Sequence, residues 1–176
     1  RQMCIRDRYD ADSYSAVRAA HKATHGSSIV PNYHFDKAKS VVSISSDFVI
    51  NGINPVGFAR DYGVMRNPDT GMSRHYQFET TLTSTGSAAD VRGAIKPSEQ
   101  GAIVLMLHNA IARLMGKATV ESKSIASDDN GVQAKVSDAA KHLVANKEQS
   151  IVIAGANNIN IQMLVNAINE LSLIHI

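Results

Sequence analysis

The stretch that decides the fold runs from Arg74 to Gly116 and reads RHYQFETTLTSTGSAADVRGAIKPSEQGAIVLMLHNAIARLMG. Residues 75–79 (HYQFE) alternate in a pattern typical of a β-strand. A loop rich in hydroxyl and small side chains follows over 80–89, and a short extended piece ends at Pro97. The longest amphipathic helix of the chain then begins at Ser98, and Gly116 is suited to the position after its end. We expect its core-facing residues to be Ile103, Leu107, Ala110, Ile111 and Leu114.

Two further runs, 40–45 (SVVSIS) and 150–154 (SIVIA), predict buried strands because β-branched residues are frequent in them. Strands that alternate with helices predict a parallel sheet with helices on its faces, in a Rossmann-like α/β domain. The remaining helices are predicted over 14–24 with Asp12 or Ser13 as cap, over 55–62 from Pro55, over 137–146 with Ser137 as cap, and after Gly155 with Ile161, Leu164, Val165 and Ile168 on one face.

The two ends of the chain are related at the level of their codons. Residues 3–8 (MCIRDR) can be back-translated into a string whose reverse complement encodes LSLIHI, the sequence of 171–176. Inverted flanks of this kind are expected around a DNA insert between transposon ends, such as the adapters of sequencing libraries. We therefore expect 1–8 and 171–176 to be adapter-derived and to lack native packing, and 9–170 to be an incomplete α/β domain.

Composition gives little indication of a partner. The 176 residues carry a formal net charge of +2, but the excess comes from the expected adapter segment at 1–8. Without that segment basic and acidic residues are equal in number, which does not favour nucleic acid as a partner. The only cysteine, Cys4, lies there too, so 9–170 has no thiolate for a metal or an iron–sulfur cluster. No apolar run approaches the ~18–20 residues that span a bilayer.

Motifs for catalysis are missing from the sequence, which contains no G-x-S-x-G, H-E-x-x-H or Walker loop. Ser46 and Asp47 directly follow the predicted strand at 40–45, where open α/β sheets bind ligands. A turn or helix-capping role for Asp47 is the favoured interpretation. Glu79, Asp47 and Asp90 are isolated carboxylates for which the sequence identifies no partner.

Two other polar patterns also favour structural interpretations. His21 and His25 have a spacing that can hold a metal on one helix face, but no third ligand accompanies them. Solvated histidines at a helix end are therefore the favoured interpretation. Residues 128–131 (DDNG) lack the alternating acidic spacing of a calcium loop and predict a turn.

The order of elements and motifs resembles the molybdopterin oxidoreductase superfamily, whose fold is that of formate dehydrogenase and DMSO reductase. In that superfamily a strand ending in an acidic residue leads to an Ala-Asp … Pro-Ile-Arg-Pro-Gly-Thr element, a long helix and a later strand that ends in Gly. Here Glu79, Thr80, Ala89-Asp90 and 94–98 (AIKPS) occupy those places.

One branch is more similar, namely the molybdopterin-oxidoreductase-like subunits of alternative complex III, especially the Bacteroidetes-type form. The similar segments are YDADSYSA (9–16), NYHFDKAKSVVSISSDFV (32–49), FARDYG (58–63), MSRHYQFETTLTSTGSAADVR (72–92) and IKPSEQGA (95–102). They are distributed over nearly all of 9–170, and 72–102 is the most specific part.

The resemblance implies a domain without a cofactor in a membrane-associated respiratory complex that oxidises quinol and passes electrons to a cytochrome or terminal oxidase. The iron–sulfur clusters of such a subunit are bound in a later domain, outside this chain. Its implied partners are a multihaem cytochrome and quinol-binding integral membrane subunits, without a membrane span of its own. Its implied location is the extracytoplasmic, periplasmic face of the inner membrane.

The sequence departs from the superfamily where a cofactor would be held. Phe78-Glu79-Thr80 replaces the usual Asp-Pro-Arg, and Lys96-Pro97-Ser98-Glu99 replaces Arg-Pro-Gly-Thr, which brings a carboxylate to a position suited to phosphate. We therefore expect no catalytic, metal-binding or cofactor-binding residue in this segment. Two alternatives stay open. One is a fragment of a true molybdenum-cofactor oxidoreductase whose dinucleotide contacts Ser46, Asp47, Glu79 and Thr80, and the other is a free-standing nucleotide- or metabolite-binding module.

Overall fold

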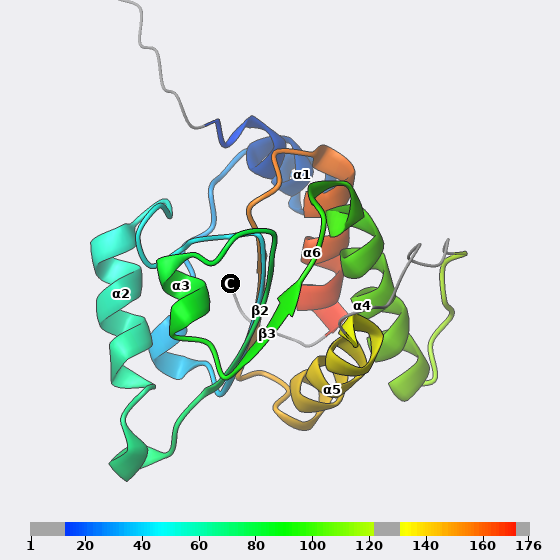
Figure 1. Cartoon of the computed structure of the whole chain (residues 1–176). Coiled ribbons are helices and arrows are strands. Elements are labelled where there is room, and N and C mark those ends of the chain that lie inside the picture. Colours follow the sequence, from blue (N-terminus) through cyan, green and yellow to red (C-terminus); the bar gives the residue numbers. More distant parts are fainter. Residues whose placement is uncertain (1–12, 122–130, 172–176) are drawn as a thin grey trace, which may run out of the picture.

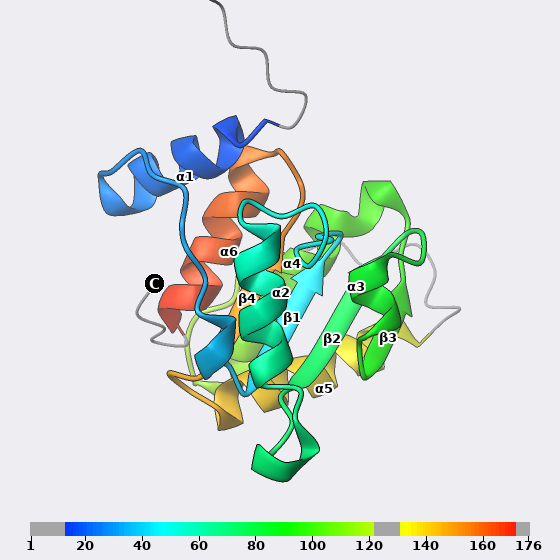
Figure 2. The same cartoon turned by 90° about the vertical axis from the view of Figure 1, so that its left-hand side faces the viewer.

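The computed structural model of the chain describes residues 13–121 and 131–171, and four parallel strands form its centre. The strands are β1 (Ser40–Ile44), β2 (Arg74–Glu79), β3 (Val91–Ala94) and β4 (Ser150–Ala154). Their order in the sheet is β3-β2-β1-β4, and every neighbouring pair is parallel (Figure 2). The predicted α/β class with a parallel, Rossmann-like arrangement is confirmed.

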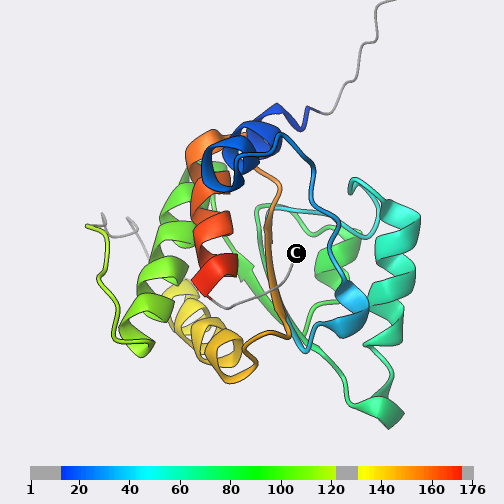
Figure 3. The same cartoon turned by 180° about the vertical axis from the view of Figure 1, so that it is seen from behind.

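Helices cover both faces of this sheet (Figures 1 and 3). One face carries α4 (Gln100–Leu114), α5 (Val132–Ala145) and α6 (Ile159–Leu171), and α1 (Ser15–His25) packs against α6. The other face carries α2 (Pro55–Val64), the short α3 (Ser84–Ser87) and the 3-10 turn η1 (Phe35–Lys37). Two further 3-10 turns, η2 (Pro68–Thr70) and η3 (Pro97–Glu99), precede β2 and α4. None of the helices within 13–121 and 131–171 is long and apolar enough to cross a membrane.

Each face of the sheet has its own apolar core, because alternate strand residues point to opposite faces. Val42, Ile44 and Tyr76 join the larger cluster beneath α4, α5 and α6. Val41 and Ile151 join the smaller one. That cluster is rich in aromatic rings from η1 and the residues just before it, from α2, and from the loop after β1, namely Tyr33, Phe35, Phe48, Phe58 and Tyr62.

Two details of the predicted helices and one of a predicted loop are wrong. Ser137 lies inside α5, which begins at Val132, because Val132 and Val136 are buried and extend the apolar stripe one turn earlier. Leu114 is 50% exposed, since the buried face of α4 ends at Ile111 and Ala112. The predicted loop at 80–89 contains α3, which begins where the Thr83 side chain accepts a hydrogen bond from the amide of Gly86.

The expected lack of packing at the carboxyl end is also wrong at one residue. Leu171 completes α6 and packs against the larger core cluster. The expected adapter segments at 1–8 and 172–176 lie outside the described residues, and so does all of the predicted turn at 128–131 except Gly131.

The outer edge of β4 is bound by side chains of α6. Asn169 Oδ1 accepts a hydrogen bond from the Val152 amide at 3.0 Å, and its Nδ2 donates to the Val152 carbonyl at 2.9 Å. Gln162 Nε2 donates to the carbonyl of Ala154 at 2.9 Å. These bonds satisfy backbone groups of an edge strand that a neighbouring strand would otherwise take.

Candidate functional site

The carboxyl ends of all four strands meet at one edge of the sheet, because the strands are parallel. After β1 the chain adds β2 and β3 on one side, and it then returns to place β4 on the other side of β1. Ligands of open α/β sheets bind at such a change of direction, outside the carboxyl ends of the strands. We therefore expect a ligand site at the carboxyl ends of β1 and β4.

The four residues proposed as fallback cofactor contacts do not lie together at this edge. Ser46 and Asp47 line a cleft at the ends of β1 and β4. Glu79 does not line it and is buried beneath α3, with 1% of its surface exposed. Thr80 is exposed and lies outside the residues that line the cleft. The sheet therefore does not bring the four residues together around one space.

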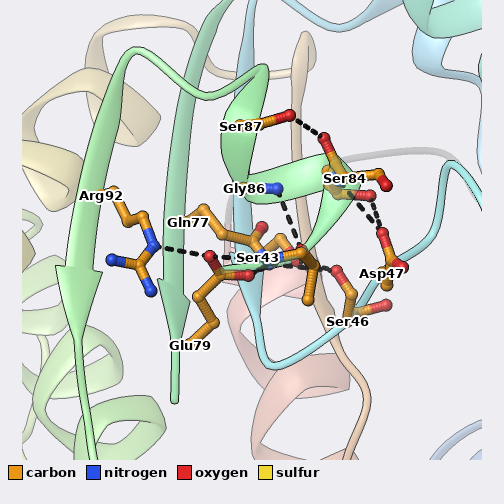
Figure 4. A network of polar contacts seen from close by, with 11 residues as sticks. Ser43, Ser46, Asp47, Gln77, Glu79, Ser84, Gly86, Ser87 and Arg92 are labelled. Atoms are coloured by element: carbon orange, nitrogen blue, oxygen red, sulfur yellow. Dashed lines mark hydrogen bonds and ion pairs between the residues drawn. The ribbon is translucent and has the colours of Figure 1, made fainter. Parts of the chain in front are cut away.

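Glu79 is the centre of a closed group of polar contacts that we call the α3 network (Figure 4). Arg92 Nε donates to Glu79 Oε1 at 2.6 Å, and Thr83 Oγ1 donates to Glu79 Oε2 at 2.7 Å. Gln77 Nε2 donates to Oε2 at 3.1 Å. A Cβ atom on Gly86 would collide with this carboxylate, so a glycine is needed where α3 packs on it. Both carboxylate oxygens are occupied by the protein itself.

The charge state of Glu79 follows from these contacts. Burial raises the pKa of its carboxyl group, but hydrogen bonds from Arg92, Thr83 and Gln77 outweigh burial and hold the pKa below the usual value. The buried group is therefore ionised at neutral pH and paired with a cation, as a buried charge requires. The prediction that Glu79 has no partner is wrong.

Asp90 is also paired, contrary to the sequence-based expectation. Arg66 makes a two-point contact with it, from Nη1 to Oδ2 at 2.7 Å and from Nη2 to Oδ1 at 3.0 Å, and the His75 amide donates to Oδ2 at 2.7 Å. Burial raises the pKa of Asp90, but the hydrogen bonds from Arg66 and from the His75 amide together outweigh burial, so the pKa is lowered. Beside this pair, His75 contacts the Tyr62 hydroxyl at 2.8 Å, and burial lowers its pKa to about 4. His75 is thus a neutral core residue at pH 7.

Asp47 has the turn and capping role that the sequence favours. Its Oδ1 accepts hydrogen bonds from the amide of Thr85 at 3.1 Å and from Thr85 Oγ1 at 2.6 Å, which ties the end of β1 to α3. Its backbone carbonyl accepts from the amides of Ile50 and Asn51. The same contacts correct the expectation that Asp47 is isolated.

The cleft beside Asp47, which we call the β1/β4 cleft, has a volume of about 610 Å³. That volume lies in the range of small-molecule sites in proteins, roughly 300–1,000 Å³. Gly155 is needed next to it, because a Cβ atom there would collide with the backbone of Ser45. Polar lining comes from Ser45, Ser46, Asp47, Asn51, Asn157 and Gln162, and aromatic lining from Tyr14, Tyr33 and Phe58.

His21 and His25 do not form a metal site in the structure. His21 is 3% exposed and stacks on His25 with ring centroids 5.0 Å apart. Burial and the neighbouring His25 lower the pKa of His21. His25 lies 3.2 Å from a carboxylate oxygen of Glu170. The solvated interpretation is therefore wrong for His21, because α1 packs against α6. Within 13–121 and 131–171 no three His, Cys, Asp or Glu side chains gather as metal ligands.

No family model and no curated protein matches the sequence. Fold and site define a Rossmann-like, parallel α/β domain with a cleft at the point where the strand order reverses.

Sequence reasoning did not identify the partners of the three carboxylates. Arg92 and Thr83 bind Glu79, Thr85 binds Asp47, and Arg66 binds Asp90. The strand pairing contains the missing signal, since Arg92 lies opposite Gln77 in the register of β2 and β3. A predicted parallel pairing of 75–79 with the extended piece before Pro97 would have placed Arg92 near Glu79.

Proposed function

We propose that this chain is a scaffold domain without a cofactor, in a subunit of a membrane-associated respiratory complex that oxidises quinol. The proposal rests on the resemblance of its segments to the molybdopterin-oxidoreductase-like subunits of alternative complex III. The subunit would lie on the extracytoplasmic face, against a multihaem cytochrome and integral membrane subunits, and would bind its iron–sulfur clusters in another domain.

The proposed absence of a cofactor is supported by the α3 network, in which both carboxylate oxygens of Glu79 already accept hydrogen bonds from the protein. A dinucleotide cofactor needs free donors for its phosphate groups at the carboxyl edge of the sheet. Arg92 is instead bound to Glu79, whose two oxygens accept hydrogen bonds from the protein. Opening this network for a phosphate would leave a buried carboxylate unpaired.

The element that replaces Arg-Pro-Gly-Thr supports the same conclusion. Glu99 Oε2 accepts a hydrogen bond from the amide of Lys96 at 2.9 Å, so its carboxylate caps the turn η3 that leads into α4. A carboxylate at the beginning of a helix occupies the place where a phosphate would otherwise bind.

The second candidate, a fragment of a true molybdenum-cofactor oxidoreductase, is favoured by one observation. The β1/β4 cleft lies where α/β sheets bind ligands, and Ser46 and Asp47 line it. Against this candidate, the residues that line the cleft include no lysine, arginine or histidine.

The test is to purify the tagged full-length gene product from its native membranes and analyse its composition. We expect a multihaem cytochrome and quinol-oxidising activity to copurify with it, without stoichiometric molybdenum or pterin. A molybdenum enzyme purified in parallel is the positive control. Stoichiometric molybdenum would establish the second candidate, and a preparation without haem subunits would contradict the scaffold proposal.

A matched variant distinguishes scaffolding from catalysis. Glu79→Gln keeps the shape of the side chain and removes its charge, so it weakens the α3 network. A scaffold role predicts a lower yield of assembled complex with unchanged quinol turnover per haem. Reduced turnover in fully assembled complex would show that this domain takes part in the reaction.

A further inference from the structure

The side chains that line the β1/β4 cleft carry a formal negative charge, although the cleft occupies a position that often binds phosphates. Asp47 is the only Asp, Glu, Lys, Arg or His among the residues that line it. Burial raises the pKa of Tyr33, so that hydroxyl stays neutral. An anion in this space would meet one carboxylate and no cationic side chain. The formal charge of the cleft therefore favours a cation.

Asp47 retains an oxygen that can serve a ligand. Both of its contacts with Thr85 use Oδ1. Oδ2 has no hydrogen-bond partner in the described part of the chain. Because Thr85 fixes the carboxylate from the α3 side, Oδ2 is held in place and stays open to a ligand. A fixed carboxylate oxygen is a suitable acceptor for an ammonium group.

The nearest helix does not reverse this electrostatic preference. The first turn of α6 is capped by its own Asn158, whose Oδ1 accepts hydrogen bonds from the amides of Asn160 at 2.9 Å and Ile161 at 3.4 Å. Two nearby side chains are also engaged. Gln162 Nε2 donates to the carbonyls of Ala154 and Ala156, and Asn157 Oδ1 accepts from the amide of Ala16. The donors of the Gln162 side chain and of the first turn of α6 are thus used internally.

Tyr14 supplies the aromatic surface of the cleft. Tyr33 and Phe58 also border it, but they are 7% and 1% exposed and belong to the smaller core cluster, so Tyr14 is the ring that can face a ligand. Aromatic rings attract organic cations through their negative faces. Ser45 Oγ is buried and has no hydrogen-bond partner. Because solvent reaches almost none of its surface, this oxygen is not a contact for a ligand in the cleft.

We propose that the β1/β4 cleft binds a small organic cation of the alkylammonium class. The ammonium lies against Asp47 Oδ2 and the ring of Tyr14. This inference goes beyond the proposed scaffold function and does not depend on it, because binding is a property of the isolated chain.

The test uses isothermal titration calorimetry on the 176-residue chain with three probes. Choline and ethanolamine represent the proposed class, and 3,3-dimethyl-1-butanol has the shape of choline without its charge. We expect choline or ethanolamine to bind, with an affinity that decreases as salt is added. The uncharged analogue should bind at least about tenfold more weakly than choline. Adenosine monophosphate, which carries a phosphate, should not bind.

Two substitutions locate the site. Asp47→Asn keeps an Oδ1 acceptor for Thr85 but removes the charge, and should weaken binding about tenfold. Tyr14→Leu keeps an apolar side chain but removes the ring, and should weaken binding about threefold. Asp69→Asn is the matched control, since Asp69 is an exposed carboxylate outside the cleft, and should leave binding unchanged. Circular dichroism confirms that each variant is folded.

Three outcomes would overturn the inference. Neither ammonium compound binds the folded chain, adenosine monophosphate binds as tightly as choline, or Asp47→Asn and Tyr14→Leu both leave choline binding unchanged. The composition of the native complex bears on none of these outcomes, so the inference and the scaffold proposal fail separately.

Discussion

The two halves of the carboxyl edge of the sheet differ in how their polar groups are satisfied. On the β2/β3 side, Glu79 has an arginine partner and further hydrogen bonds from the protein. On the β1/β4 side, Ser45 Oγ is buried and unpaired beside a cleft of about 610 Å³. The same edge of one sheet is therefore closed on one side and open on the other. The closed side is expected to contribute stability, and the open side is expected to contribute binding.

The largest effect should come from removing the centre of the closed side. Glu79→Ala leaves Arg92, Thr83 and Gln77 without their shared acceptor, and should lower the free energy of unfolding by about 3 kcal/mol. Urea denaturation followed by circular dichroism measures this change. Asp69→Ala, at an exposed carboxylate, should change it by less than about 0.5 kcal/mol. A similar small change for Glu79→Ala would contradict the role of the α3 network.

Acid should weaken the β2/β3 half of the sheet in a more graded way. Because burial lowers the pKa of His75 to about 4, the unfolded chain takes up a proton between its ordinary pKa of 6.5 and pH 4 while the folded chain does not. Stability is therefore expected to fall as the pH is lowered through this window. It should fall further at lower pH, where Glu79 and Asp90, with lowered pKa values, become protonated.

Urea unfolding measured from pH 7 to pH 4 tests this dependence. His75→Gln should flatten the decrease between pH 6.5 and pH 4, whereas His34→Gln, which changes an exposed histidine, should not. A wild-type stability that is constant down to pH 5 would show that His75 is not held in a neutral state by burial.

A smaller effect is expected at the residue that joins the two sides. Thr85 Oγ1 donates to Asp47 and accepts from the amide of Val49 at 3.2 Å, so Thr85→Val removes both contacts at nearly constant volume. The free energy of unfolding should fall by about 1.5 kcal/mol. Thr81→Val, at an exposed threonine of the same loop, is the matched control. Choline binding should weaken as well, because Asp47 is no longer held by two bonds.

The smallest effect should be an increase in stability, and it concerns a residue on the β1/β4 side. Ser45 has a φ of 51°, in the left-handed region that glycine adopts without steric cost. Ser45→Gly relieves this conformation and removes the unpaired hydroxyl, so stability should rise by about 0.5 kcal/mol. A loss of stability would show that the Ser45 side chain is satisfied in the folded protein.

The sequence predicts the fold better than it predicts the site, for physical reasons. Strands such as 40–44 and 150–154 are buried on both faces, and their β-branched composition records that burial locally. Gly26 and Gly116, with positive φ values, also follow helices as predicted. Partners such as Arg92 for Glu79 depend on strand register, and the burial of His21 depends on how α1 meets α6. Neither the strand register nor the packing of α1 against α6 can be inferred from local composition.

The bridge between Asn169 and Val152 has a consequence for the growth of the sheet. With the amide and carbonyl of Val152 already bound, an incoming strand at β4 would have to displace a paired side chain. The opposite edge, β3, has no such side-chain bridge to its backbone among the residues that the structure describes. Extension of the sheet, whether by another part of a larger protein or by unwanted self-association, is therefore directional and would begin at β3.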